Sequence, residues 1–205
     1  MSKSTIYIIR HGQTEFNRQH IIQGSGVDSS LNDTGRQQAK AFFDHYKEVP
    51  FELVLTSSLK RTRETASWFI DRGITWEKWP EINEIGWGIH EGKESEPWMK
   101  DSYLRVVGEW KRGNFSASVE GGESAAEMIA RLSKFVDHLR QRTEENILVC
   151  SHGRAMRCLM CLLNDQSASA MENYRHANTG LYQFRLEDGR FHMLKKNDTV
   201  HLSNT

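Results

Sequence analysis

Four side chains with the chemistry to bind and attack an anion follow apolar runs of the sequence. Arg10 and His11 end the run at 6–9, Arg61 follows the run at 51–55, and His152 follows the run at 147–150. Arginine presents a planar fork of donors that fits two phosphate oxygens, and imidazole is a nucleophile. Neighbouring cations disfavour imidazolium, which would keep His11 neutral near pH 7. The pattern predicts an anion pocket with His11 as its nucleophile.

The elements that must position these groups are predicted from hydrophobic periodicity. Short apolar runs bounded by turn residues indicate strands buried on both faces, at 6–9, 51–55, about 76–80 and 146–151. Helical spacing predicts helices at about 33–46, 58–71, 123–142 and 154–163. Parallel strands bring their carboxyl ends to one edge, where such sheets place ligands. We therefore expect an α/β fold of three layers, with a doubly wound, mainly parallel sheet and helices on both faces.

The remaining segments are less regular. The hydroxyls of 56–58 offer N-caps for the helix that carries Arg61, and the glycine-rich stretch 81–92 is predicted to be a loop. The stretch at about 93–122 is predicted to be a lid-like insertion, with a helix near 96–112. Asp188-Gly189 between two short β-like runs indicates a hairpin.

Composition narrows the class of protein. The 205 residues suit a single domain spanning 1–205, and no repeat or linker divides them. Lys plus Arg and Asp plus Glu number 27 each, so nucleic-acid and membrane partners are not expected. No signal peptide is recognised, and the odd number of cysteines, 3, favours reduced thiols and a cytoplasmic location. Cys158 and Cys161 are expected to pack in the core. The sequence allows a homodimer but does not decide the oligomeric state.

The ordered motifs resemble the histidine phosphatase superfamily, which includes the cofactor-dependent phosphoglycerate mutases, and the resemblance covers nearly the whole chain. The blocks that carry it are Arg10-His11-Gly12-Gln13-Thr14-Glu15-Phe16-Asn17, Gln23-Gly24 with Leu31-Asn32-Asp33-Thr34-Gly35, Thr56 to Ala66, Asn83-Glu84 with Gly86 to Gly92, and Ser151-His152-Gly153. The resemblance implies a phosphoglycerate mutase-like fold and phosphoryl transfer without a metal.

Roles can be carried over by position. The resemblance implies that His11 becomes phosphohistidine, while Arg10, Arg61 and His152 bind the phosphoryl group. It implies that Glu84 is the acid and base, although Glu81 and Glu91 are nearby alternatives. Asn17, Gln23, Gly24 and Gly153 are expected to lie beside the phosphate.

The insertion at about 93–122 and the C-terminal stretch 197–202 resemble the phosphatase members of the superfamily more than the mutases. Mutases carry an arginine-rich insertion and a C-terminal tail, whereas the nearest basic pair here is Lys111-Arg112 and three residues follow Leu202. Glu120-Gly121-Gly122-Glu123-Ser124 and the stretch 197–202 also resemble phosphatase members. We expect hydrolysis of a small phosphorylated metabolite without a cofactor. The alternative is a mutase that uses 2,3-bisphosphoglycerate. Whether Trp98 and Trp110 line the pocket or pack the insertion stays open.

Two other classes of protein would use the same residues. A zinc hydrolase would use His11, Glu84 and His152 as ligands, but the flanking arginines would repel a metal ion. A non-catalytic phosphate-binding module would normally lack the nucleophile or the acid, and both are present in this sequence.

Overall fold

The computed structural model describes residues 4–94 and 96–203 of the chain. Its six strands form one sheet in the order β3-β2-β4-β1-β5-β6. The strands are β1 (Ser4–Arg10), β2 (Leu53–Thr56), β3 (Thr75–Lys78), β4 (Asn146–Ser151), β5 (Leu181–Glu187) and β6 (Arg190–Asp198). Strands β1 to β4 pair in parallel, whereas β5 and β6 form an antiparallel hairpin added beside β1. The predicted mainly parallel sheet is therefore confirmed, with a mixed edge.

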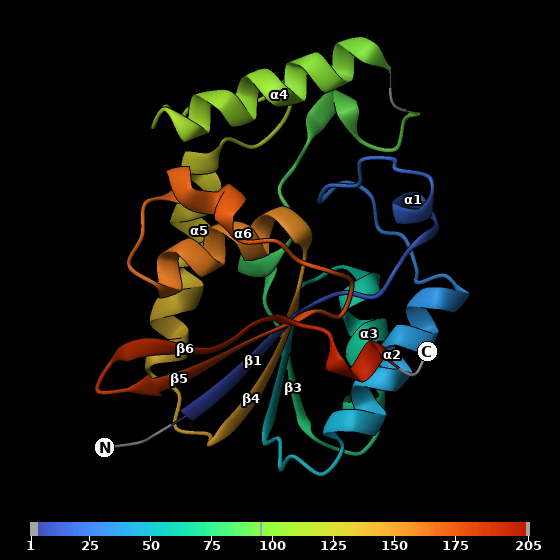
Figure 1. Ribbon diagram of the computed structural model, residues 1–205, viewed down its shortest axis with the longest axis vertical. Helices are drawn as coiled ribbons and strands as arrows, with labels where there is room; N and C mark the ends of the chain where they lie inside the picture. The colour runs from blue at the N-terminus through green and yellow to red at the C-terminus, as the bar shows by residue number, and fades with distance from the viewer. Residues whose placement is uncertain (1–3, 95, 204–205) are drawn as a thin grey trace.

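Helices cover both faces of this sheet (Figure 1). The helices are α1 (Glu15–Arg18), α2 (Asp33–Tyr46), α3 (Lys60–Ile70), α4 (Pro97–Lys111), α5 (Ala125–Arg140) and α6 (Gly153–Leu163). Short 3-10 turns lie at η1 (Pro80–Ile82), η2 (Gly88–His90), η3 (Ala168–Asn173) and η4 (Val200–Leu202). Helices α2 and α3 pack on one face and α5 and α6 on the other, while α4 crosses one end of the molecule.

Alternation along β1 explains why its run is apolar throughout. Ile6 and Ile8 belong to the core beneath α5 and α6, whereas Tyr7 and Ile9 belong to the core beneath α2 and α3. Successive side chains of a strand point to opposite faces, so a sheet covered on both faces requires apolar residues at every position. The strand ends at Arg10, where the chain leaves the two cores.

Three local predictions needed correction. The helix that carries Arg61 has Leu59 at its N-cap, with no side-chain cap, because leucine has no acceptor; the Ser57 hydroxyl accepts from the Leu59 N–H at 3.1 Å. The predicted strand at 76–80 is shifted to Thr75–Lys78, since pairing with β2 stops at Thr56. The stretch 81–92, predicted to be a loop, contains part of η1 and all of η2.

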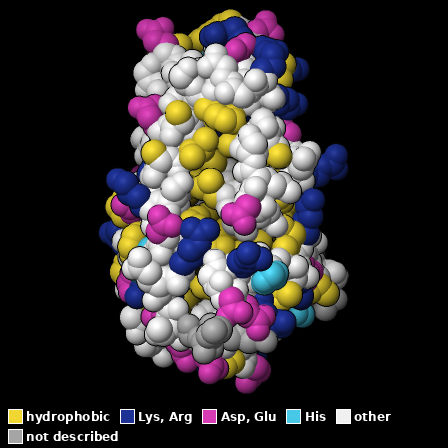
Figure 2. Space-filling view, turned by 90° about the vertical axis from the view of Figure 1, so that its left-hand side faces the viewer, with side chains coloured by type: hydrophobic (Ala, Val, Ile, Leu, Met, Phe, Trp, Pro, Cys, Tyr) yellow, Lys and Arg dark blue, Asp and Glu magenta, His cyan; other side chains and the backbone are white. Residues whose placement is uncertain are grey.

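Helix α4 matches the helix predicted within the insertion, and the cysteine prediction holds. Cys158 and Cys161 are buried and unpaired on α6, and burial raises the pKa of each thiol to about 12. No helix in the described part of the chain is both long and apolar enough to span a bilayer. Basic and acidic side chains are interspersed on the face in Figure 2, as the balanced composition predicts.

Candidate active site

A cavity of about 380 Å³ opens at the carboxyl edge of the sheet, beneath α4. Its lining includes many of the predicted residues: Arg10, His11, Asn17, Gln23, Glu84 and Gly153. Arg61, His152 and Gly24 do not line it. The convergence of β1, β4 and their following loops arises because parallel strands end at one edge.

His11 is buried and held in one orientation. Its Nδ1 lies 2.7 Å from the carbonyl oxygen of Gly12, and its backbone N–H donates to the Ser151 carbonyl on β4 at 3.0 Å. A carbonyl can only accept, so Nδ1 carries the proton and Nε2 keeps its lone pair. Burial, then Arg61 and Arg10, hold the pKa of His11 well below its ordinary value. The imidazole is therefore neutral at pH 7, with Nε2 available for attack.

Arg10 lines the cavity beside His11. Its Nε is buried and has no hydrogen-bond partner in the described part of the chain. Burial lowers the pKa of Arg10 to about 10, although the Glu84 carboxylate opposes the shift. The guanidinium stays charged at neutral pH. Burying a charge without a partner is costly, so this arginine is suited to an anion that enters from solution.

His152 and Arg61 lie behind His11. The His152 and His11 ring centroids are 5.2 Å apart, and Arg61 Nε donates to His152 Nδ1 at 3.1 Å. The neutral ring then carries its proton on Nε2, which donates to the Ser57 hydroxyl at 2.7 Å. Burial, then Arg61, lower the pKa of His152 well below its ordinary value. Both ring nitrogens are thus engaged within the protein.

Arg61 also orders the loop that carries Gly24. Its terminal nitrogens donate to the carbonyls of Val27, at 2.6 Å, and Gly24, at 3.2 Å. A guanidinium has five N–H groups, so two remain after these bonds and the bond to His152. A Cβ at Gly24 would lie 1.9 Å from the Glu91 carboxylate and 2.5 Å from the Ile85 carbonyl. Glycine lets this loop approach the segment that bears Glu84.

The Glu84 carboxylate is fixed at the N-terminus of α6. One oxygen accepts from the Arg154 N–H at 3.0 Å, and the other accepts from the Ala155 N–H at 2.9 Å and its neighbour Ile85 at 3.0 Å. The first N–H groups of a helix lack partners inside the helix, so this acid satisfies two of them. Of the three acids considered from sequence, Glu84 lines the cavity and Glu81 and Glu91 do not.

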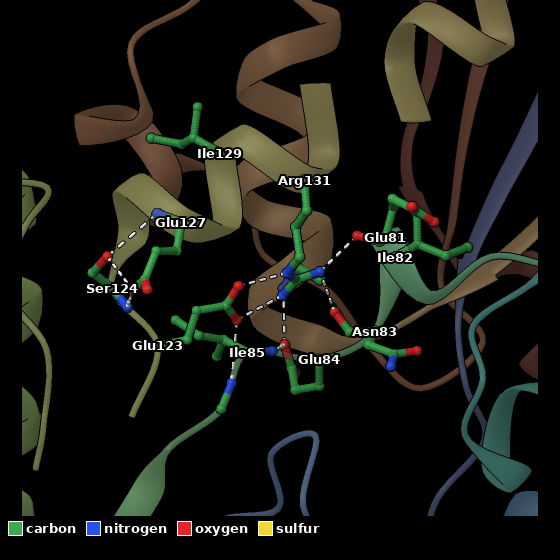
Figure 3. A network of polar contacts seen from close by, with 12 residues as sticks. Glu81, Ile82, Asn83, Glu84, Ile85, Glu123, Ser124, Glu127, Ile129 and Arg131 are labelled. Atoms are coloured by element: carbon green, nitrogen blue, oxygen red, sulfur yellow. Dashed lines mark hydrogen bonds and ion pairs between the residues drawn. The ribbon is translucent and has the colours of Figure 1, made fainter. Parts of the chain in front are cut away.

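Arg131 of α5 holds the segment before Glu84 (Figure 3). Its Nη1 donates to the carbonyls of Glu81 and Asn83 at 2.6 and 2.8 Å. The rest of its guanidinium forms a bidentate pair with Glu123 at 2.6 and 2.9 Å. Arg131 therefore joins α5 to the backbone directly preceding the acid, and no sequence motif singled it out.

The other predicted site residues, Asn17, Gln23 and Gly153, differ in how many of their polar groups are already bonded within the protein. Asn17 lines the cavity while its Oδ1 caps α1 by accepting from the Thr14 N–H at 3.2 Å. Gln23 donates to the Thr14 hydroxyl at 2.6 Å, so its amide is partly engaged in the loop. A Cβ at Gly153 would lie 2.9 Å from the ring of His176. The absence of a side chain at Gly153 lets the His176 ring pack against the N-terminus of α6.

Several cavity residues were missed in the sequence, namely Lys100, Tyr103, Arg154, Arg157 and His176. A usable signal existed for two of them, because Arg154 and Arg157 stand one helical turn apart directly after the His152 motif. Trp98 is exposed, Trp110 is buried in the core, and neither tryptophan lines the cavity. Lys111 and Arg112 lie at the end of α4 and do not line it either.

No group of three or more His, Cys, Asp or Glu side chains is arranged to hold a metal ion within residues 4–94 and 96–203. The zinc-hydrolase alternative therefore has no clustered ligand set in this part of the chain.

The chain is similar in sequence to known bisphosphatases and similar in fold to a solved phosphatase structure. The chain is 32% identical over 169 residues to rat 6-phosphofructo-2-kinase/fructose-2,6-bisphosphatase 3, a match that covers 82% of this chain and 29% of that protein. It is 31% identical over 154 residues to zebrafish fructose-2,6-bisphosphatase TIGAR B, covering 73% and 56% respectively. The chain thus spans less than two thirds of either relative. The alpha-ribazole phosphatase of Shigella flexneri shares the fold, with a TM-score of 0.85 and 24% identity over 95% of this chain and 96% of that one.

The family model of the histidine phosphatase superfamily (branch 1) matches residues 6–199, which include every predicted site residue. This match, the two relatives above 30% identity and the shared fold confirm the resemblance inferred from the motifs. The chain belongs to the histidine phosphatase superfamily.

Proposed function

We propose that this protein is a phosphomonoesterase that hydrolyses a small phosphorylated metabolite through a phosphohistidine at His11. The observation that carries the proposal is the pairing of two groups at one cavity wall. Arg10 is a charged guanidinium whose Nε has no acceptor among residues 4–94 and 96–203, and His11 is a neutral imidazole with Nε2 free. A phosphoryl group satisfies both at once, as an anion for the arginine and an electrophile for the histidine.

The first step transfers the phosphoryl group to the protein. Nε2 of His11 forms a bond to phosphorus, and the bond between phosphorus and the ester oxygen breaks. Glu84 gives its proton to that oxygen, so the leaving group departs as a neutral alcohol. Arg10 donates to the phosphoryl oxygens as charge develops, and Arg61 and His152 add positive charge and dipoles from behind His11.

The second step returns the nucleophile. Water attacks phosphorus, its proton passes to Glu84, and the bond between Nε2 and phosphorus breaks to release inorganic phosphate. No metal is needed, since the surrounding arginines stabilise the anionic transition state that a metal would otherwise serve. Those same cations oppose the binding of a metal ion.

The test is a screen of phosphorylated metabolites in metal-free buffer with chelator, with phosphate release as the readout. Acid-labile and base-stable labelling of the protein by a ³²P-substrate, absent in His11→Ala, is the expected result. Phosphate release that requires added zinc would contradict the proposal.

A mutase is the second candidate, because it would share the first step, the formation of phosphohistidine at His11. Incubation with 3-phosphoglycerate, with and without 2,3-bisphosphoglycerate, separates the two. We expect phosphate release without stimulation by the bisphosphate. Efficient isomerisation with little phosphate release would favour the mutase.

A further inference from the structure

The stretch 177–180, which we call the pre-β5 loop, lies against the end of β1 and takes no part in the two chemical steps. We propose that Asn178 of this loop is a positioning residue, whose side-chain amide joins the carbonyl of the nucleophile His11 to Asn17. The C-terminal stretch 197–202, a motif to which phosphoryl transfer assigns no role, holds the loop in place. The proposal rests on the proposed function in taking His11 as the nucleophile.

The pre-β5 loop continues the support of β1 beyond the strand itself. Strand β1 pairs with β5 up to the residue before Arg10. Past that point the Thr179 N–H donates to the Arg10 carbonyl at 2.9 Å, and Asn178 Nδ2 donates to the His11 carbonyl at 2.9 Å. The His11 N–H donates to the Ser151 carbonyl of β4 on the other side. Both backbone polar groups of the nucleophile are therefore bonded, one toward each neighbouring strand.

The orientation of the Asn178 amide follows from the atoms around it. Its Nδ2 lies 2.9 Å from the His11 carbonyl oxygen and 3.4 Å from Asn17 Oδ1. Asn17 Oδ1 itself accepts from the Thr14 N–H, so both neighbours of the Asn178 amide are acceptors. Only the NH₂ end of the amide can serve two acceptors, because it carries two N–H groups. Asn178 thus bridges the nucleophile and a second residue of the cavity wall.

Asn178 acts through other residues and not on the substrate. It is half-buried, and the described residues that line the cavity include His11 and Asn17 but not Asn178. Its substitution therefore removes no contact to a phosphate ester. Any effect on the rate has to come from the position of the groups that Asn178 holds.

The contact fixes the peptide plane that follows the nucleophile. The His11 carbonyl and the Gly12 N–H belong to one planar peptide. Its carbonyl accepts from Asn178, and its N–H donates to the Thr65 hydroxyl at 2.9 Å. The next carbonyl, that of Gly12, is the one that faces His11 Nδ1. A rotation of this plane would move that acceptor, and with it the ring whose Nε2 attacks phosphorus.

The C-terminal stretch holds the pre-β5 loop from behind. Asn197 Oδ1 accepts from the Ala177 N–H at 2.8 Å. A Cβ at Gly180 would lie 2.3 Å from the same oxygen, so a glycine is required where the two segments meet. One side chain of the C-terminal motif therefore packs against both ends of the loop.

Thr179 adopts a backbone conformation that needs an external restraint. Its φ is +55°, in the left-handed region that β-branched residues rarely adopt. Its hydroxyl and His201 Nε2 are 2.9 Å apart, and both residues are buried. His201 belongs to η4, which packs against α2 (Figure 1) and places the His201 ring 5.2 Å from that of Phe42. Strained conformations of this kind persist where the surrounding structure fixes them, and they are concentrated at functional sites.

Removal of the amide tests the proposal kinetically. Asn178→Ala should lower kcat for p-nitrophenyl phosphate by about tenfold, because misplacing a reacting group by about 1 Å can cost up to about 10²-fold. KM should change by less than about threefold, since no side chain of the cavity wall is removed. Asn178→Ser, whose hydroxyl is too short to reach both oxygens, carries the same expectation if the alanine variant does not fold. Tyr174→Phe is the matched control, because it removes one hydrogen bond, to Gln166, close to the loop, and it should retain kcat.

The restraint on the loop is tested by a conservative pair. Thr179→Val keeps the branched shape but loses the hydroxyl, and it should lower kcat about threefold. Thr179→Ser keeps the hydroxyl and should stay within about twofold of the unaltered protein. In the Asn178→Ala background, Thr179→Val should add little, because both changes act on the same peptide. A lower unfolding temperature with an unchanged kcat in the Asn178 variants would show a purely structural role and overturn the proposal.

The His11 ring gives a readout that does not depend on turnover. Long-range ¹H–¹⁵N spectra report which ring nitrogen carries the proton, and the spectrum of His11→Gln assigns the signals. We expect the Nδ1–H form in the unaltered protein and in Tyr174→Phe, and a mixture of both forms in Asn178→Ala. The proposal requires both effects, so an unchanged kcat or an unchanged His11 signal in the Asn178 variants overturns it.

Failure of the proposed function would look different. The unaltered protein would then neither hydrolyse p-nitrophenyl phosphate nor become labelled at His11. In that case the spectra of the His11 ring still decide whether Asn178 positions it. Hydrolysis and labelling that persist unchanged in Asn178→Ala refute the positioning role alone.

Discussion

The two ends of the cavity are built in different ways. At the phosphoryl end, His11 and His152 are buried and their ring nitrogens bond to a backbone carbonyl, a buried arginine and a buried hydroxyl. At the far end, Lys100 is exposed and Arg157 is held by two partly exposed side chains, Glu172 and His176. The groups proposed to carry the chemistry are therefore anchored to strand ends and the sheet core, whereas the far end of the cavity is lined by side chains that include those of α4 and α6.

This difference has an energetic basis. Buried hydrogen bonds resist substitution, because a partner left unsatisfied costs about 1–3 kcal/mol. Pairs near solvent contribute less and tolerate exchange. The phosphoryl end should consequently be intolerant of change, and the far end should vary in ligand preference while the fold persists.

Replacement of the nucleophile should have the largest effect. His11→Ala is expected to lower the rate of phosphate release by at least about 10³-fold, because it removes the imidazole that lies beside Arg10 with Nε2 free to attack phosphorus. Thermal unfolding would confirm that the variant folds. The exposed His192→Ala is the matched control, and substantial activity remaining in His11→Ala would break the assigned roles.

Removal of the acid should cost somewhat less and depend on the leaving group. Glu84→Gln should lower kcat by about 10²-fold with an alkyl phosphate, whose oxygen needs a proton. The loss should be much smaller with p-nitrophenyl phosphate, whose phenolate leaves without one. Glu81→Gln, outside the cavity, should resemble the unaltered protein. Equal losses with both substrates would indicate that Glu84 is not the acid.

Arg131→Gln should have an intermediate effect through the position of Glu84. It removes donors to two backbone carbonyls, so we expect kcat to fall about tenfold and stability by about 1–3 kcal/mol. In the Glu84→Gln background, the same change should leave kcat almost unaltered. Independent, multiplying effects on kcat would show that Arg131 acts by another route.

Mild acid should produce the smallest effect per residue, and the buried histidines of the cavity region should contribute to it. The pKa values of His11, His152 and His176 lie below their ordinary value in the folded protein, whereas the unfolded chain takes up protons near pH 6.5. The unfolded state then binds more protons as the pH falls, so stability decreases.

Between pH 7.5 and 5.5, we expect a loss of about 1 kcal/mol for each of these three histidines. Urea unfolding at the two values measures it. In His11→Gln the loss should shrink by that share, and in His192→Gln it should not. Stability that rises toward pH 5.5 would contradict the neutral state of these rings.

Much of the phosphoryl end could be predicted from sequence. Apolar runs marked β1, β2 and β4, and the polar residues at their ends identified Arg10, His11, Arg61 and His152 as neighbours. The sheet class followed for the same reason, because burial on both faces leaves a continuous apolar run. The added hairpin was also visible from Asp188-Gly189.

The far end could not be predicted, because its residues meet only in three dimensions. Nothing in the sequence places Lys100 of α4 opposite Arg157 of α6, or Arg131 beneath the acid. Local patterns report a residue's own element, whereas the packing of helices is decided by side chains distant in sequence. The sequence by itself predicted the groups that we propose perform the chemistry. Only the tertiary structure decided that Arg61 and His152 lie behind His11, and which cations of α4 and α6 line the cavity, because these residues come together only when the helices pack.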